Sequence, residues 1–70
     1  MVNASEIKER MEVKGSDGKH IGMIDSMEGK RVKLAAGGMY HYIDLATVDS
    51  VKDGAVILSK TAEETTRTWH

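Results

Sequence analysis

Apolar and polar positions alternate along several short stretches of the chain. Strict alternation is typical of a β-strand with one buried face, whereas an amphipathic helix repeats every three or four residues. No long stretch of the sequence has that helical repeat. The alternation therefore predicts six short strands, at residues 11–14, 21–27, 31–34, 40–45, 48–51 and 55–58.

Glycine-containing segments separate the predicted strands. Three of them combine glycine with charged residues, at 16–19, 28–30 and 52–54. Such segments favour tight turns, and Gly18 can adopt the positive φ that some turns require. Residues 35–38 are expected to form a flexible loop. Gly22 instead interrupts an apolar run, which predicts a β-bulge or a close approach of neighbouring backbone.

Two capping boxes mark predicted helix starts, Asn3–Glu6 and Thr61–Glu64. In this motif the first side chain accepts a hydrogen bond from an early amide, and the glutamate reaches back to the first residue. The first box predicts a short helical turn over residues 7–10. The second predicts a C-terminal helical segment that carries Trp69.

These elements predict an all-β fold of one domain over residues 1–70. We expect a small antiparallel β-barrel of about six short strands, with short helical segments at both ends. Closure into a barrel would remove exposed strand edges, which promote aggregation. The predicted core consists of Met11, Val13, Ile21, Ile24, Met27, Val32, Leu34, Ile43, Leu45, Val48, Val51, Val56 and Leu58.

Composition narrows the possible partners and locations. The chain of 70 residues has 10 basic and 11 acidic residues, so it lacks the positive excess typical of nucleic-acid-binding domains. It has no cysteine and no apolar run approaching the roughly 20 residues of a membrane span. Its first residues lack the basic and apolar regions of a signal peptide. We expect a cytoplasmic protein without membrane insertion, for which nucleic acid is a disfavoured partner.

Three segments together resemble a known protein family. They read MEVKGSDGKHIGMIDSMEGKRVKL, HYIDLATVDSV and GAVILSKTAEE, within a similarity from about Ile7 to Glu64. The most telling part is the G-x-D-G-x-x-I-G hairpin that precedes an aliphatic strand. The sequence resembles a small bacterial family of unknown function that looks like free-standing PRC-barrel domains.

The resemblance implies a docking or assembly role rather than catalysis. Larger PRC-barrel proteins include the H subunit of the photosynthetic reaction centre and a ribosome maturation factor. No catalytic residues carry over to this chain. The sequence departs from the family pattern at Asp44, where relatives tend to have proline, and at Thr47, where they often have tryptophan. A partner site built on that tryptophan or on the short 35–38 loop is not implied here.

The segment GSDGKHIG, residues 15–22, could suggest phosphate or RNA binding. A P-loop needs four residues between its glycines and a Ser or Thr after Gly-Lys, whereas His20 follows Lys19 here. The segment Gly15–Gly18 matches the GXXG loop of KH domains, but that loop joins two helices. Asp17 would also repel phosphates. A glycine hairpin accounts for all of these residues.

The histidines are weak metal-ligand candidates. Zinc needs three or four ligands in a fixed geometry. His20 and His41 lie on different predicted strands, and His70 ends the chain. We predict no metal, no cofactor and no catalytic residue. A small metal- or ligand-binding protein that uses His20 and His41 stays open as an alternative.

The strongest candidate for binding is the cluster around Tyr40-His41-Tyr42. In a strand, Tyr40 and Tyr42 share one face and His41 takes the other. Since Ile43 and Leu45 are also apolar, some aromatic surface should stay exposed. Ile57 should point outward if its two neighbours point inward. The candidate partner-binding residues are Met39, Tyr40, His41, Tyr42, Ile57 and Trp69.

The sequence thus predicts a non-catalytic protein-interaction or assembly module. Its partner is an unidentified protein or a second copy of the chain. Trp69 either folds back over Ile57 in a monomer or contacts that partner. The alternative functions are RNA or ribosome association, through a first half that holds seven of the ten basic residues, and binding of a metal or small ligand.

Overall fold

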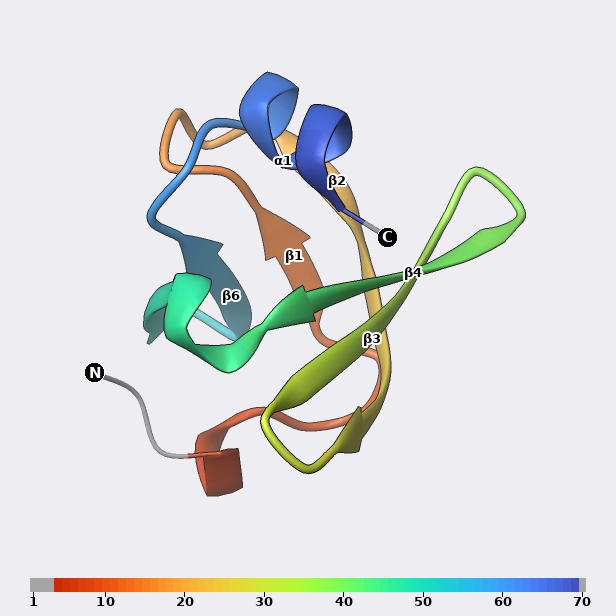
Figure 1. The fold of residues 1–70 in the computed structure, drawn as a ribbon. Coiled ribbons are helices and arrows are strands. Elements are labelled where there is room, and N and C mark those ends of the chain that lie inside the picture. The colour runs from red at the N-terminus through yellow and green to blue at the C-terminus, as the bar shows by residue number, and fades with distance from the viewer. Residues whose placement is uncertain (1–3, 70) are drawn as a thin grey trace.

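The computed structural model describes residues 4–69, which form a six-stranded sheet with a short helix packed on it (Figure 1). The strands follow the order β4-β3-β2-β1-β6-β5 in the sheet. In chain order the elements are η1 (Ala4–Glu6), β1 (Glu12–Lys14), β2 (His20–Glu28), β3 (Arg31–Ala36), β4 (Met39–Asp44), η2 (Leu45–Thr47), β5 (Val48–Lys52), β6 (Ala55–Leu58) and α1 (Ala62–Thr68).

The sheet is mostly antiparallel, but it is not the uniform antiparallel sheet that the sequence predicted. Strands β1 and β6 pair in parallel, with Val13 opposite Val56. Alternation in a sequence records which face of a strand is buried and not its direction, so this pair could not be read from the pattern. Over residues 4–69 no ladder joins the outermost strands β4 and β5, so closure into a barrel is not shown.

The core lies on one face of the curved sheet. Its buried hydrophobic side chains are Ile7, Val13, Ile21, Ile24, Val32, Leu34, Ile43, Val48, Ala55, Val56 and Leu58. Four predicted core residues are only partly buried against this cluster: Met11, Met27, Leu45 and Val51. The prediction missed Ile7, which precedes the first strand. Two backbone hydrogen bonds, Arg10 N to Ile24 O and Ile24 N to Met11 O, hold this segment along β2.

The predicted helical turn over residues 7–10 is wrong. The structure has a short 3-10 helix at Ala4–Glu6 and an extended connection with a turn at Arg10, whose φ is 69°. The proposed cap residue Asn3 lies outside the described residues. A single turn of helix has little stability of its own, so packing of Ile7 against the sheet decides the conformation here.

The predicted flexible loop at 35–38 is also wrong, because β3 and β4 continue almost to each other. Only Gly37 and Gly38 lie between them, with φ of 59° and 80°. Two residues with positive φ form the tight turn that matches the twist of a hairpin. The result is a long β3–β4 hairpin whose tip projects beyond the rest of the molecule (Figure 1).

Gly22 of β2 lies against the end of the neighbouring strand β3. A Cβ at this position would collide with the carbonyl oxygen of Ala35 and lie 3.0 Å from the Cβ of Ala36. The register of β1 against β2 also shifts next to this point, after the Val13–Gly22 pair. The predicted close approach of backbone at Gly22 is therefore confirmed.

The C-terminal helix α1 begins with the predicted capping box. The amide of Glu64 donates to the hydroxyl oxygen of Thr61 at 3.2 Å, and the amide of Thr61 donates to the Glu64 carboxylate at 3.2 Å. The bond from the Thr61 amide, and after it a bond that the Thr61 hydroxyl donates to the same carboxylate at 3.1 Å, hold the pKa of Glu64 below its ordinary value of 4.5. No helix within residues 4–69 has the length and apolar character needed to cross a membrane.

Replacing Gly22 by valine should destabilise the protein by about 1–3 kcal/mol, because the added side chain overpacks against backbone that cannot move aside. For a domain of this size that loss corresponds to a fall in melting temperature of about 4–8 °C for each kcal/mol. Thermal unfolding followed by circular dichroism measures it. The exposed neighbour Met23, changed to valine, is the matched control and should leave the melting temperature nearly unchanged. An unaltered Gly22→Val protein would contradict the close approach.

Acid should weaken the fold partly through Glu64. Because the folded state lowers the pKa of this carboxyl, the charged form stabilises the fold at pH values above 4.5, and this contribution is lost as pH falls through the folded pKa. Urea unfolding at a series of pH values should show a shallower acid-side loss for Glu64→Gln than for the unmodified protein. Glu63→Gln removes the same charge one residue earlier and serves as the control. Identical pH profiles for Glu64→Gln and the unmodified protein would refute this role.

Candidate functional site

The glycine-rich segment at residues 15–22 is a turn held against the start of α1. The amide of Ser16 donates to the carbonyl of Lys60 at 2.8 Å, and the amide of Ala62 faces the Asp17 carboxylate at 3.4 Å. A Cβ on the buried Gly15 would lie 2.8 Å from the carbonyl carbon of Thr61. The carboxylate of Asp17 thus occupies the helix start that a phosphate would need, so this segment joins the sheet to the helix.

The β3–β4 hairpin carries most of the predicted binding residues, on opposite faces. Residues paired across its ladder share a face, and Leu34 of the core is paired with His41. His41 therefore lies on the core face, whereas Tyr40 and Tyr42 lie on the outer face. This is the distribution that alternation predicted for the three residues.

An apolar row crosses the outer face of the hairpin. Met23 of β2 is paired with Ala35 of β3, and Ala35 is paired with Tyr40 of β4. Met23 is 45% exposed and Tyr40 is 58% exposed. The ammonium group of Lys33 lies 4.6 Å from the centre of the Tyr40 ring, in cation–π geometry. Alternation could have identified Met23 as an outward residue, but only the register places it beside Tyr40.

Met39 and Tyr42 differ from Tyr40 in their surroundings. Met39 is 63% exposed at the hairpin tip, where it pairs with Ala36. Tyr42 is half-buried, and its hydroxyl donates to the Glu28 carboxylate at 3.1 Å. The exposed large hydrophobic side chains are therefore Met23 and Tyr40 on the outer face, which Tyr42 borders, and Met39 on the opposite face at the tip.

Trp69 folds back onto its own sheet. Its ring stacks on the imidazole of His41 with centroids 3.8 Å apart and planes at 4° to each other. The amide of Trp69 donates to the Thr65 carbonyl at 2.9 Å, which keeps the residue in line with α1. The ring that Trp69 stacks on belongs to β4, whereas Ile57 lies on β6, half-buried between Lys14 and Ser50. The six predicted binding residues thus do not form one continuous patch.

The two described histidines are kept apart. The Nδ1 atom of His20 lies 2.9 Å from the Glu12 carboxylate. Glu12 precedes buried Val13, and His20 is paired with Lys14, which follows it, so both residues lie on the outer face. His41 lies on the core face under Trp69. Across residues 4–69 no group of three or more His, Cys, Asp or Glu side chains could hold a metal ion. His70 is outside the described residues.

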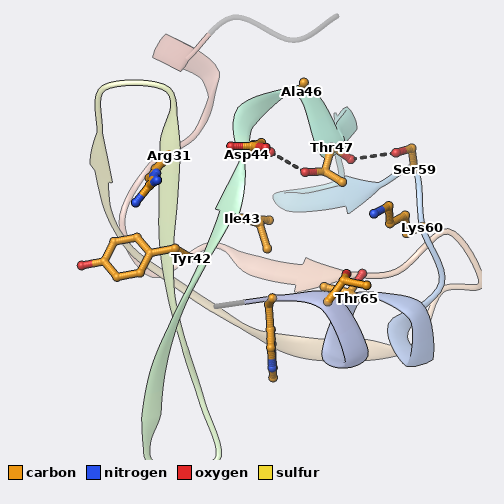
Figure 2. A pocket seen from close by; sticks show the side chains of 11 residues that line it. Arg31, Tyr42, Ile43, Asp44, Ala46, Thr47, Ser59, Lys60 and Thr65 are labelled. Carbon is orange, nitrogen blue, oxygen red and sulfur yellow. Dashed lines mark hydrogen bonds between the residues drawn. The ribbon is translucent and has the colours of Figure 1, made fainter.

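A groove of about 470 Å³ lies along the free edge of β4, between this strand and the C-terminal segment (Figure 2). Ile43 points into it from β4, and Lys60 extends toward β4 from the opposite side. Its walls come from Arg31, Tyr42, Ile43, Asp44, Ala46, Thr47, Ser59, Lys60, Thr65, Thr68 and Trp69. The groove could not be predicted from the sequence, because its two walls are built by segments far apart in the chain.

Most of the chain matches one known protein family. Residues 7–66 match the sequence profile of a family described as an uncharacterized protein conserved in bacteria, DUF2171. The chain belongs to the DUF2171 family. This confirms the predicted relationship to a bacterial family of unknown function. Neither the curated proteins nor the solved structures include a match to this sequence.

The segment that defines DUF2171 membership includes every strand of the sheet and most of α1. It ends at residue 66, before the end of the helix and before Trp69. The stack between His41 and Trp69 thus joins a residue inside the family segment to one beyond it. Family membership alone therefore does not imply the contact between Trp69 and the core face of β4.

Removing the Trp69 ring should destabilise the protein by about 1–3 kcal/mol, since a half-buried aromatic loses both its burial and its stacking partner. Urea unfolding of Trp69→Ala, followed by far-ultraviolet circular dichroism, measures the loss. Trp69→Phe keeps a stacked ring and should recover part of it. Arg67→Ala removes only an exposed ion pair with Glu63 and is the control. If Trp69→Ala unfolded at the same urea concentration as the unmodified protein, the stack would have no structural role.

Proposed function

We propose that this protein is a non-catalytic assembly module, similar to a PRC-barrel domain, that binds protein surfaces through its β3–β4 hairpin. The observation that carries the proposal is the position of the exposed large hydrophobic side chains. Among residues 4–69 these are Met23, Met39 and Tyr40, and all three lie on or beside the hairpin. Their clustering on a projecting element is what a binding surface requires and what chance exposure does not explain.

The chemistry of the hairpin supports recognition of protein. Tyrosine and methionine are enriched in the centres of protein interfaces, because they combine large contact area with adaptable packing. RNA is a weaker candidate, since two of the basic side chains in the first half are already paired. Lys14 lies 3.9 Å from the Glu12 carboxylate, and Lys33 lies 3.8 Å from that of Asp25.

We take a second copy of the chain as the partner of this surface. A symmetric contact would place the Met23–Ala35–Tyr40 row of one copy against the same row of the other. The net charge of −1 opposes such association only weakly. A domain of 70 residues also has a small core, and small domains often gain stability by oligomerising.

A role without catalysis agrees with the contacts that His41, His20 and Glu64 make within the fold. His41 is covered by Trp69, His20 is paired with Glu12, and the carboxylate of Glu64 caps α1. The mostly antiparallel sheet and short C-terminal helix support the comparison with PRC-barrel domains, which act as docking units. The lack of cysteine suits a reducing compartment, and we place the module in the cytoplasm.

Sedimentation velocity over a wide concentration range tests the assembly role. The unmodified protein should shift from monomer to dimer as its concentration rises. Tyr40→Ser should weaken dimerisation by about tenfold or more, because a loss of about 1.4 kcal/mol changes an equilibrium constant tenfold. Lys52→Ser, on the strand at the other end of the sheet order, is the control and should dimerise normally.

Two results would contradict the assembly proposal. A protein that stays monomeric at every concentration would exclude a second copy as the partner and leave only a different protein. A dimer that Tyr40→Ser and Met23→Ser do not weaken would show that association uses another surface.

A further inference from the structure

The groove along the edge of β4 offers a second binding site, separate from the row of Met23, Ala35 and Tyr40. Its volume of about 470 Å³ falls within the range of about 300–1,000 Å³ that is usual for sites binding small molecules. Figure 2 shows β4 along one side of the groove, with α1 and the segment after β6 along the other. Three observations indicate which kind of ligand the groove binds. They concern the open edge of β4, the side chains of the groove walls and the charges of the lining residues.

The first observation is that the backbone of β4 is open along the groove. Strand β4 ends the sheet order, so within the described residues only β3 pairs with it. The two-residue turn makes Ala36 and Met39 a hydrogen-bonded pair, and hydrogen-bonded pairs then alternate along an antiparallel ladder. By this alternation Tyr40 and Tyr42 direct their amide and carbonyl groups away from β3. These groups can pair with one more strand.

The second observation is that the walls of the groove suit the side chains of such a strand. Ile43 and Trp69 provide apolar surface on the core side. The hydroxyl groups of Thr47, Ser59, Thr65 and Thr68 already donate to backbone carbonyls. These hydroxyl protons are therefore not available to a ligand. The hydrogen-bond donors that a ligand could use in the groove are the cationic side chains and the free backbone amides.

The third observation is the charge of the groove. It has two cations, Arg31 and Lys60, and one carboxylate, Asp44. Over residues 4–69 neither cation has a carboxylate within 4.0 Å, although Asp44 is the cross-strand partner of Arg31. Lys60 stands on the wall opposite β4 and extends toward it (Figure 2). The lining residues thus carry one more positive than negative charge, which an acidic side chain beside Lys60 would balance.

We propose that this groove binds an extended acidic peptide segment of a partner protein, which adds as a strand to the open edge of β4. The backbone of the segment pairs with Tyr40 and Tyr42, as in other cases of strand addition at a sheet edge. Its apolar side chains cover Ile43 and Trp69, and an acidic side chain faces Lys60. A single extended segment suits the site better than the hairpin of a second copy. The groove is bounded by α1 on the far side and by η2 at its end, which leaves no place for a paired strand.

Binding of defined peptides tests the proposal. The probe is a capped peptide, about six residues long like a typical strand, in which glutamate alternates with valine. Comparison peptides carry lysine in place of glutamate, or proline in place of the central valine. Fluorescence of Trp69, the single tryptophan of the chain, reports binding at the groove. Amide chemical shifts of Tyr40 and Tyr42 in NMR report pairing at the β4 edge.

The glutamate peptide should bind at least about tenfold more tightly than either comparison peptide, and its affinity should fall as salt rises. Lys60→Ala should weaken it several-fold, and Lys60→Glu should reverse the preference in favour of the lysine peptide. Lys52→Ala, which changes a cation on β5, should leave the affinity unchanged. Tyr40→Ser, which tests self-association, should still bind because pairing uses the backbone at this position.

Several results would overturn the proposal. Equal binding of the glutamate and lysine peptides would remove the acidic preference, and binding without shifts of the Tyr40 and Tyr42 amides would exclude strand addition. A lack of binding by the glutamate peptide would refute the site altogether. None of these results depends on dimerisation, so failure here is distinct from failure of the assembly role.

Discussion

The C-terminal segment contacts two parts of the sheet that are not neighbours in the strand order. Its first residues are bound to the β1–β2 turn through Ser16, Asp17 and the tightly packed Gly15. Its last described residue, Trp69, stacks on His41 of β4. Because β4 lies at one end of the sheet order, this stack ties the edge strand of the projecting hairpin to the C-terminal segment. Trp69 also lines the groove, so the same contact forms part of its wall.

The two faces of the hairpin consequently have different surroundings. On the core face, Trp69 covers His41, and the groove runs along the adjoining edge of β4. The outer face carries the exposed Met23 and Tyr40, with Lys33 beside the Tyr40 ring. One strand, β4, thus serves two proposed contacts, of which one uses side chains and the other uses the backbone edge.

Local signals in the sequence were reliable where one short segment contains all the necessary partners. The Thr61–Glu64 box forms as predicted, because its donors and acceptors are three residues apart. Gly22 was recognised because a glycine within an apolar strand needs a steric reason, and the Ala35 carbonyl provides it. The prediction failed at residues 7–10 and 35–38, where packing of Ile7 and continuation of the β3–β4 ladder outweigh the local composition.

The sequence by itself determined the strands, the helix cap and the face on which His41 lies relative to Tyr40 and Tyr42, because these depend on the spacing of neighbours in one segment. Only the tertiary structure decided that β1 and β6 run parallel, that Met23 lies beside Tyr40, and that Trp69 covers His41. The groove belongs to the second group as well, since Ile43 and Lys60 come from separate segments. The physical reason is that alternation records burial, whereas strand order, direction and register arise from contacts between residues distant in the chain.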